Sequence, residues 1–139
     1  MLIAETGGLN AMLVDSTALP EQAVRDVLAS AFQSAGQRCS ALRIRRRGRN
    51  HGMLTGAMEE LTVGDPAQLS TDVGPVIDEE ARASIEADCA DMEAKGKLVV
   101  RLDAPGEGRF VAPRIVHVSG IGDLEREIFG PVLHAPAPP

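Results

Sequence analysis

Cys39 is the residue whose type and surroundings most directly suggest covalent chemistry. It follows Gly36, Gln37 and Arg38 in a glycine-containing segment at the end of an expected helix. The positive charge of Arg38 would favour the thiolate, which is the form of cysteine that attacks electrophiles. The alternative is a small buried apolar residue, which most free cysteines are. On local evidence, Cys39 is therefore a candidate nucleophile in a loop.

Glu5 is a candidate general base. It opens the segment Glu5-Thr6-Gly7-Gly8, and the two glycines leave room for a substrate or cofactor to approach the backbone. The alternative is an exposed acid that precedes a turn. On local sequence alone, the exposed acid is the favoured interpretation.

The remaining cysteine and the histidines give no sign of a metal site. Cys89 lies on an expected helical apolar stripe, so we expect it in the core. His51, His117 and His134 lie on different segments without the spacing of metal ligands. No glycine-rich phosphate-binding fingerprint follows an expected strand. We therefore expect no metal.

The composition is typical of one globular domain. The chain has 139 residues, of which 44% are hydrophobic and only 2% aromatic, so its core must use small aliphatic side chains. The formal net charge of −6 argues against a nucleic-acid-binding protein. No apolar stretch is long enough for a membrane span, and the N-terminus has no basic signal-peptide region. We expect a cytoplasmic protein with two free thiols.

A strand and a helix precede Cys39 and would position it. The apolar run Leu9–Val14 predicts a strand, and Pro20 opens a helix. Gly36 is the expected end of that helix, which would deliver the chain directly to Cys39. Apolar residues at the helical period form its expected buried stripe: Val24, Val27, Leu28, Ala31 and Phe32.

The rest of the chain continues the alternation. We expect a second helix at Met53–Leu61 and a third that starts at Asp78 and ends at Gly96. Strands are expected at Leu98–Leu102 and Phe110–Val118. Strands interleaved with helices predict an α/β fold. The third helix should bury Ala81, Ile85, Cys89 and Met92.

Two segments do not fit this pattern. Arg43–Arg49 carries five arginines where a core strand is expected. Burial of even one unpaired arginine costs several kcal/mol, so we expect Arg45–Gly52 to be exposed to solvent. The chain also ends in Ala135–Pro139, and proline, which lacks an N–H, should not continue a sheet. One interpretation is a frameshifted or degenerate gene.

Three motifs together resemble the signatures of the aldehyde dehydrogenase superfamily, in the family's order. They are Glu5-Thr6-Gly7-Gly8, Gly36-Gln37-Arg38-Cys39 and Glu127-Ile128-Phe129-Gly130-Pro131-Val132. The flanking segments 9–20, 34–43 and 63–78 narrow the resemblance. They look like the L-glutamate γ-semialdehyde (1-pyrroline-5-carboxylate) dehydrogenase module of bacterial proline utilization A.

The resemblance implies a role for each matched residue. Cys39 would attack the aldehyde to give a thiohemiacetal and then a thioester, and its N–H would supply half of the oxyanion hole. Glu5 would activate the hydrolytic water. Ser40 would help to hold the substrate carboxylate. NAD is the implied cofactor, and the residues expected beside it are Gly7, Glu127 and Phe129.

The resemblance also implies that residues 1–139 are a fragment of a longer catalytic domain, with residues 45–52 and 135–139 divergent. An incomplete α/β domain would expose part of its core and would self-associate. Two function classes therefore stay open: an NAD-dependent aldehyde dehydrogenase, and an inactive fragment that acts at most as an interaction piece. A nucleic-acid binder that uses the arginine run is disfavoured.

Overall fold

The computed structural model describes residues 7–46 and 51–136 of the chain. Its centre is one mixed sheet with the strand order β1-β2-β5-β4-β3. The first four strands in this order run parallel, and β3 pairs with β4 in the antiparallel sense. The strands are β1 (Asn10–Leu13), β2 (Leu42–Arg46), β3 (Leu98–Arg101), β4 (Arg114–Val118) and β5 (Val132–Pro136). The predicted α/β class is confirmed.

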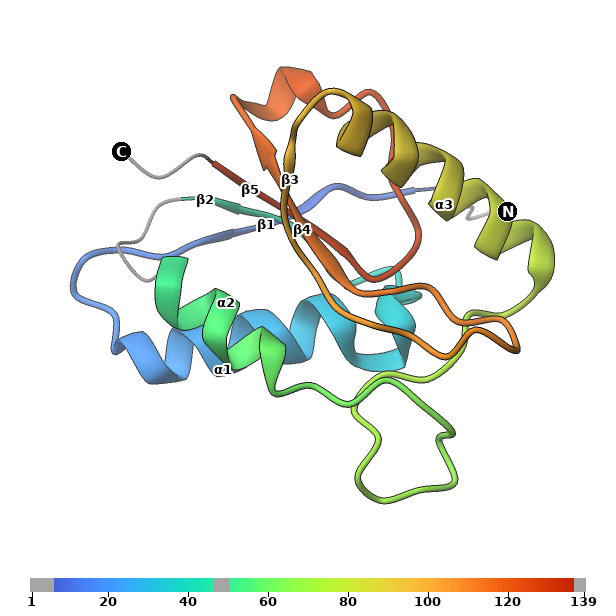
Figure 1. The fold of residues 1–139 in the computed structure, drawn as a ribbon. Helices are drawn as coiled ribbons and strands as arrows, with labels where there is room; N and C mark the ends of the chain where they lie inside the picture. The colour runs from blue at the N-terminus through green and yellow to red at the C-terminus, as the bar shows by residue number, and fades with distance from the viewer. Residues whose placement is uncertain (1–6, 47–50, 137–139) are drawn as a thin grey trace, which may run out of the picture.

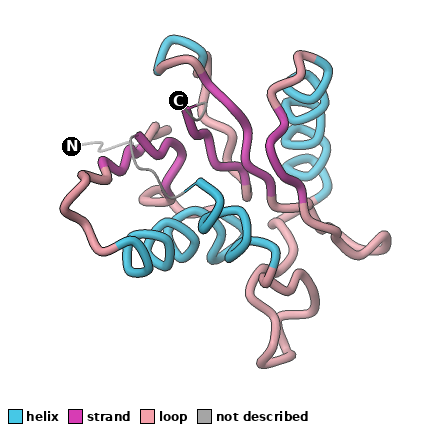
Figure 2. Tube along the Cα trace, turned by 60° about the vertical axis from the view of Figure 1, so that its left-hand side comes forward, coloured by secondary structure: helices cyan, strands magenta, loops and turns pink. Residues whose placement is uncertain are grey.

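Helices cover both faces of this sheet. The helices α1 (Pro20–Phe32) and α2 (His51–Glu59) lie side by side on one face, and α3 (Glu79–Ala94) lies on the other (Figure 1). The rotated view separates the same three layers (Figure 2). Buried residues of all three helices and of β2, β4 and β5 belong to one hydrophobic cluster.

The helices α1 and α3 begin where their local sequence predicts, whereas α2 begins at His51 rather than at the predicted Met53. Pro20 occupies the first turn of α1, where its missing N–H costs nothing. Asp78 caps α3, because its Oδ1 accepts a hydrogen bond from the N–H of Ala81 at 2.8 Å. Cys89 of α3 is fully buried, as expected. Burial raises the pKa of its thiol to about 11.

The end of α1 differs from its prediction. The helix stops at Phe32, and a 3-10 turn, Gln33–Gly36, follows it. Ser34 and Ala35 have φ values of 55° and 53°, so the chain leaves the right-handed helical region before it reaches Gly36. Gly36 is therefore not the residue that ends the helix, and its own role depends on a tertiary contact described below.

The expectation that Arg45 lies in solvent is wrong. Arg43 and Arg45 are 0% and 3% exposed on β2, which lies between β1 and β5. Arg43 escapes the predicted cost because it is paired with Glu127. The Nε of Arg45 has no hydrogen-bond partner among the described residues, and burial lowers the pKa of this side chain.

The neighbourhood of Arg45 is a buried cluster of nitrogen groups. The rings of His51 and His117 are stacked 5.6 Å apart. His51 Nε2 and His117 Nδ1 are buried and have no partner in the described part of the chain. The arginines of residues 47–49 lie outside the described residues.

The expected break of the sheet at Ala135 is also wrong. The parallel pairing of β5 with β4 runs to the pair Val118–Pro136. Pro136 is the last residue of β5 that the structure describes, and it keeps its carbonyl acceptor although it has no N–H to donate. Ala137 to Pro139 lie outside the described residues.

Candidate active site

Gly36 lets the cysteine loop, residues 36–41, lie directly against the segment that begins at Glu127. Its φ is +66°, and a Cβ at this position would lie only 2.3 Å from the carbonyl oxygen of Gly130. A Cβ on Gly130 would in turn lie 2.6 Å from Cδ1 of Ile85 in α3. At residue 36 only glycine permits this approach, because the clashing atom is backbone and φ is positive, whereas the contact at Gly130 is with a side chain.

Cys39 is exposed on the wall of a cavity of about 890 Å³. Its carbonyl oxygen accepts a hydrogen bond from Asn10 Nδ2 at 2.7 Å, and the same amide nitrogen reaches the carbonyl of Ala41 at 3.1 Å. This side chain of β1 therefore fixes the backbone on both sides of Ser40. The cavity is lined by Gly7, Gly8, Leu9, Asn10, Cys39, Arg126, Glu127 and Phe129.

Glu127 joins this wall to the sheet. Its Oε1 accepts from Arg43 Nε at 2.8 Å, and its Oε2 accepts from the N–H of Gly8 at 2.8 Å. A Cβ at Gly7 would lie 3.5 Å from the same Oε2. The carboxylate therefore orders the backbone that follows Glu5, although Glu5 itself lies outside the described residues.

Phe129 presents a half-exposed aromatic ring beside the carboxylate of Glu127. The ring is 43% exposed, and its centroid lies 5.2 Å from Cζ of Arg43. The carbonyl of Phe129 accepts from Gln37 Nε2 at 3.2 Å, while Gln37 Oε1 accepts from the N–H of Ile77 at 2.8 Å. Gln37 thus connects the cysteine loop to two other segments.

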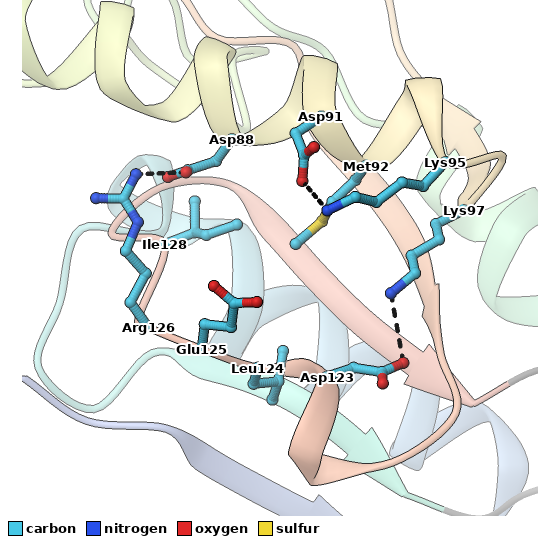
Figure 3. Close-up of a pocket in the computed structure, with 10 residues that line it drawn as sticks. All are labelled: Asp88, Asp91, Met92, Lys95, Lys97, Asp123, Leu124, Glu125, Arg126 and Ile128. Carbon is cyan, nitrogen blue, oxygen red and sulfur yellow. Dashed lines mark hydrogen bonds and ion pairs between the residues drawn. The ribbon is translucent and has the colours of Figure 1, made fainter.

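A smaller hollow of about 100 Å³ lies between α3 and residues 123–128 (Figure 3). Ion pairs close it: Lys95 with Asp91, Lys97 with Asp123 at 3.4 Å, and Arg126 with Asp88. Of these pairs, Arg126–Asp88 joins the segment before Glu127 to α3, and Lys97–Asp123 joins it to the residues that follow α3. Among the described residues, no group of three or more histidine, cysteine or acidic side chains could hold a metal ion.

Most of the predicted site residues lie together. Cys39, Glu127, Phe129 and Gly7 line the same cavity. Ser40 is exposed beside Cys39 but does not belong to that lining.

The side chain of Arg38 contacts the end of α1. Its Nη2 donates to the carbonyls of Ala29 and Ser30, at 2.9 and 3.3 Å, near the end of α1. These bonds direct the guanidinium toward the carbonyl end of the helix, where cations are favourable.

Local sequence reasoning missed Asn10, Gln37 and Arg43 as supports of the site. Their partners lie 29 to 92 positions away along the chain. The signal for Arg43 was its residue type, because the pattern predicted a buried strand at that position.

Comparisons with known proteins agree with this arrangement. A family model described as the aldehyde dehydrogenase family matches residues 1–135. Bifunctional protein PutA of Escherichia coli (strain K12) is 52% identical over 146 aligned residues, which cover 96% of this chain. The chain spans 11% of the length of that curated relative.

Solved structures give the same result. A mutant of proline utilization A (PutA) from Bradyrhizobium japonicum superposes with a TM-score of 0.88 at 48% identity, over 94% of this chain and 14% of that one. A 1-pyrroline-5-carboxylate dehydrogenase from Thermus with bound NAD gives a TM-score of 0.83 at 32% identity, over 95% of this chain and 27% of that one.

Proposed function

This chain belongs to the aldehyde dehydrogenase family, and we therefore propose that it carries the nucleophile of an NAD-dependent dehydrogenase. The proposed reaction is the oxidation of L-glutamate γ-semialdehyde to glutamate, a step of proline catabolism. The observation that carries the proposal is the meeting of Cys39, Glu127 and Phe129 on one cavity wall. The similarity to PutA and to 1-pyrroline-5-carboxylate dehydrogenase supports the choice of substrate.

Cys39 is the proposed nucleophile. Its thiolate attacks the aldehyde carbon, and the carbonyl oxygen becomes the oxyanion of a thiohemiacetal. Loss of hydride from that carbon leaves a thioester on Cys39. The hydrogen bond from Asn10 to the Cys39 carbonyl keeps the loop in place, so that the sulfur stays on the cavity wall.

The cavity wall fits the nicotinamide–ribose end of NAD. Phe129 offers an exposed aromatic face, and Glu127 offers carboxylate oxygens that keep lone pairs for ribose hydroxyls after they bind Arg43 and Gly8. Gly7 leaves the approach open. NAD, when bound, accepts the hydride that leaves the substrate carbon.

Hydrolysis of the thioester and recognition of the substrate are assigned to two further residues. Glu5 is the proposed base that activates the water, and it lies outside the described residues. Ser40 is proposed to bind the substrate carboxylate. Its exposed position next to Cys39 leaves its hydroxyl accessible.

The test is the formation of NADH by the purified chain with L-glutamate γ-semialdehyde. We expect turnover that Cys39→Ala abolishes and that the matched variant Cys89→Ser, at the buried thiol, retains. No NADH from the unmodified chain, or equal rates for the chain and Cys39→Ala, would refute the proposal.

A second candidate function is an inactive fragment that acts as an interaction piece. Leu13 on the edge strand β1 and Leu19 after it are 76% and 61% exposed, which favours a surface that another chain covers. A chain that forms no NADH yet elutes as an oligomer would support this candidate over the first.

A further inference from the structure

Arg43 is a fully buried arginine on β2 that contacts two segments far apart in the sequence. Its Nε binds Glu127 Oε1 at 2.8 Å, and its Nη1 binds the carbonyl of Gly130 at 3.1 Å. Its Nη2 donates to the carbonyl of Arg38 at 3.4 Å. The ring of Phe129 lies over the same guanidinium. One side chain therefore engages both the cysteine loop and residues 127–130.

The contact with Arg38 bears directly on the nucleophile. The carbonyl of Arg38 belongs to the peptide group that contains the N–H of Cys39. A hydrogen bond to this oxygen therefore restricts rotation of the peptide group next to the sulfur-bearing residue. The other two bonds hold Glu127 and Gly130, on either side of Phe129.

The planar fork of the guanidinium suits this task. Arginine has five N–H donors in fixed directions, so one side chain can bind a carboxylate and two carbonyls at once. Lysine keeps the positive charge but has a single nitrogen at the end of its stem. Lysine at this position can satisfy Glu127 but cannot also reach both carbonyls in the same geometry.

We propose that Arg43 is a positioning residue that fixes Cys39 and the Glu127–Phe129 wall in one geometry. This inference rests on the proposed function for its effect on catalysis. The link between the two segments is independent of that function. The competing explanation is that Arg43 only stabilises the fold, as buried ion pairs with a sheet residue can do.

Arg114 supplies a matched control. It is 1% exposed on β4, and it is paired with Glu86 and Glu93 of α3 at 3.0 Å. Arg114 thus matches Arg43 in residue type and burial and is also paired with carboxylates, but its partners are on α3 and beside its own strand rather than in the cysteine loop.

The first experiment is amide hydrogen exchange on Arg43→Met, Arg43→Lys and Arg114→Met. In Arg43→Met we expect about tenfold faster exchange in residues 36–41 and 127–132 together, as for loss of a charge-assisted hydrogen bond. In Arg43→Lys, which keeps the pairing with Glu127, the cysteine loop should loosen, and residues 127–132 should loosen less than in Arg43→Met. Arg114→Met should affect α3 and β4 and leave the cysteine loop unchanged.

The buried thiol of Cys89 reports whether each variant stays folded. Cys89 should remain unlabelled by a thiol reagent in Arg43→Met. Faster exchange throughout the chain together with labelling of Cys89 would mean a stabilising role only, and would overturn the proposal. Unchanged exchange in both segments would overturn it as well.

The second experiment measures aldehyde oxidation. Because misplacement of reacting groups by about 1 Å can cost on the order of 100-fold in rate, we expect Arg43→Met to lower kcat by about that factor while Arg114→Met keeps it. A folded Arg43→Met with the kcat of the unmodified chain would overturn the proposal. If the unmodified chain oxidises no aldehyde, the proposed function fails, and hydrogen exchange alone decides whether Arg43 links the two segments.

Discussion

Gly36 and Gly130 set how closely the cysteine loop approaches the wall that carries Glu127 and Phe129. Two features exclude a side chain at residue 36. They are the positive φ of Gly36 and the 2.3 Å that would separate a Cβ there from the carbonyl oxygen of Gly130. Rotation of a side chain relieves neither the positive φ nor this overlap, because both involve backbone atoms. The approach therefore tolerates only glycine at residue 36.

Replacement of Gly36 by alanine should destabilise the protein. We expect Gly36→Ala to lower the free energy of unfolding by about 2–4 kcal/mol, from the left-handed backbone and the overlap with Gly130. Urea denaturation measures this value. Gly56→Ala is the control, because Gly56 is exposed in α2 with no atom within 4 Å of an added Cβ. That variant should gain up to about 1 kcal/mol. Equal effects of the two changes would contradict the close contact between residues 36 and 130.

The two thiols should differ strongly in reactivity. Cys39 is exposed, whereas Cys89 is fully buried with a pKa raised to about 11 by that burial. At pH 8 we expect a thiol reagent to modify Cys39 at once and Cys89 only in denaturant. Mass spectrometry of the labelled peptides separates the two sites. Rapid modification of Cys89 in the native protein would show that α3 does not pack as described.

At the scale of single elements, β2 carries the largest departure from expectation. Arg43 and Arg45 are buried on this strand, which lies between β1 and β5. Arg43 has a carboxylate partner, whereas Arg45 lies near His51, whose pKa is lowered first by burial and then by the charge of Arg45. This environment therefore favours the neutral form of His51.

We expect the free energy of unfolding to fall in mild acid because of His51 and His134. Burial, helped by the charges of Arg45 and His117, lowers the pKa of His51 below 6.5, and burial also lowers the pKa of His134. Below pH 6.5 the unfolded chain therefore binds protons that the folded chain does not. The stabilisation is complete above this pH and is lost as the pH falls through the lower, folded-state pKa values.

Urea midpoints between pH 8 and pH 5 measure this effect. His51→Gln should flatten the fall, since glutamine carries no titrating group. An equally steep fall in His51→Gln and in the unmodified protein would assign the pH dependence to other groups.

At the scale of the whole molecule, both edges of the sheet end in short strands. β1 is an edge strand in the sheet order, and its Leu13 is 76% exposed. Unpaired edges with exposed apolar residues are sites of association.

No helix among the described residues is long and apolar enough to cross a membrane.

A charge on this edge should weaken self-association. We expect Leu13→Lys to shift the protein toward the monomer in light scattering coupled to size exclusion. Leu69→Lys is the control, because Leu69 is exposed in the loop between α2 and α3, away from the sheet. A monomeric unmodified chain, or equal shifts in both variants, would remove β1 as the associating edge.

Local sequence was sufficient to predict the parts that depend on neighbours along the chain. The apolar stripe of α1, the cap of α3 by Asp78 and the exposed loop at Cys39 are each set within about ten residues. Three short motifs also identified the family, because their types and order are specific.

The environment of the charged and glycine residues, in contrast, emerged only from the packing of distant segments. Whether Arg43 is tolerated in the core depends on Glu127, which is 84 positions away, and the need for Gly36 depends on the carbonyl of Gly130. The place of Pro136 in the sheet depends on its pairing with Val118 of β4. Burial of a charge, a backbone clash and a ladder bond all depend on which distant segment lies opposite, and local sequence does not contain that information.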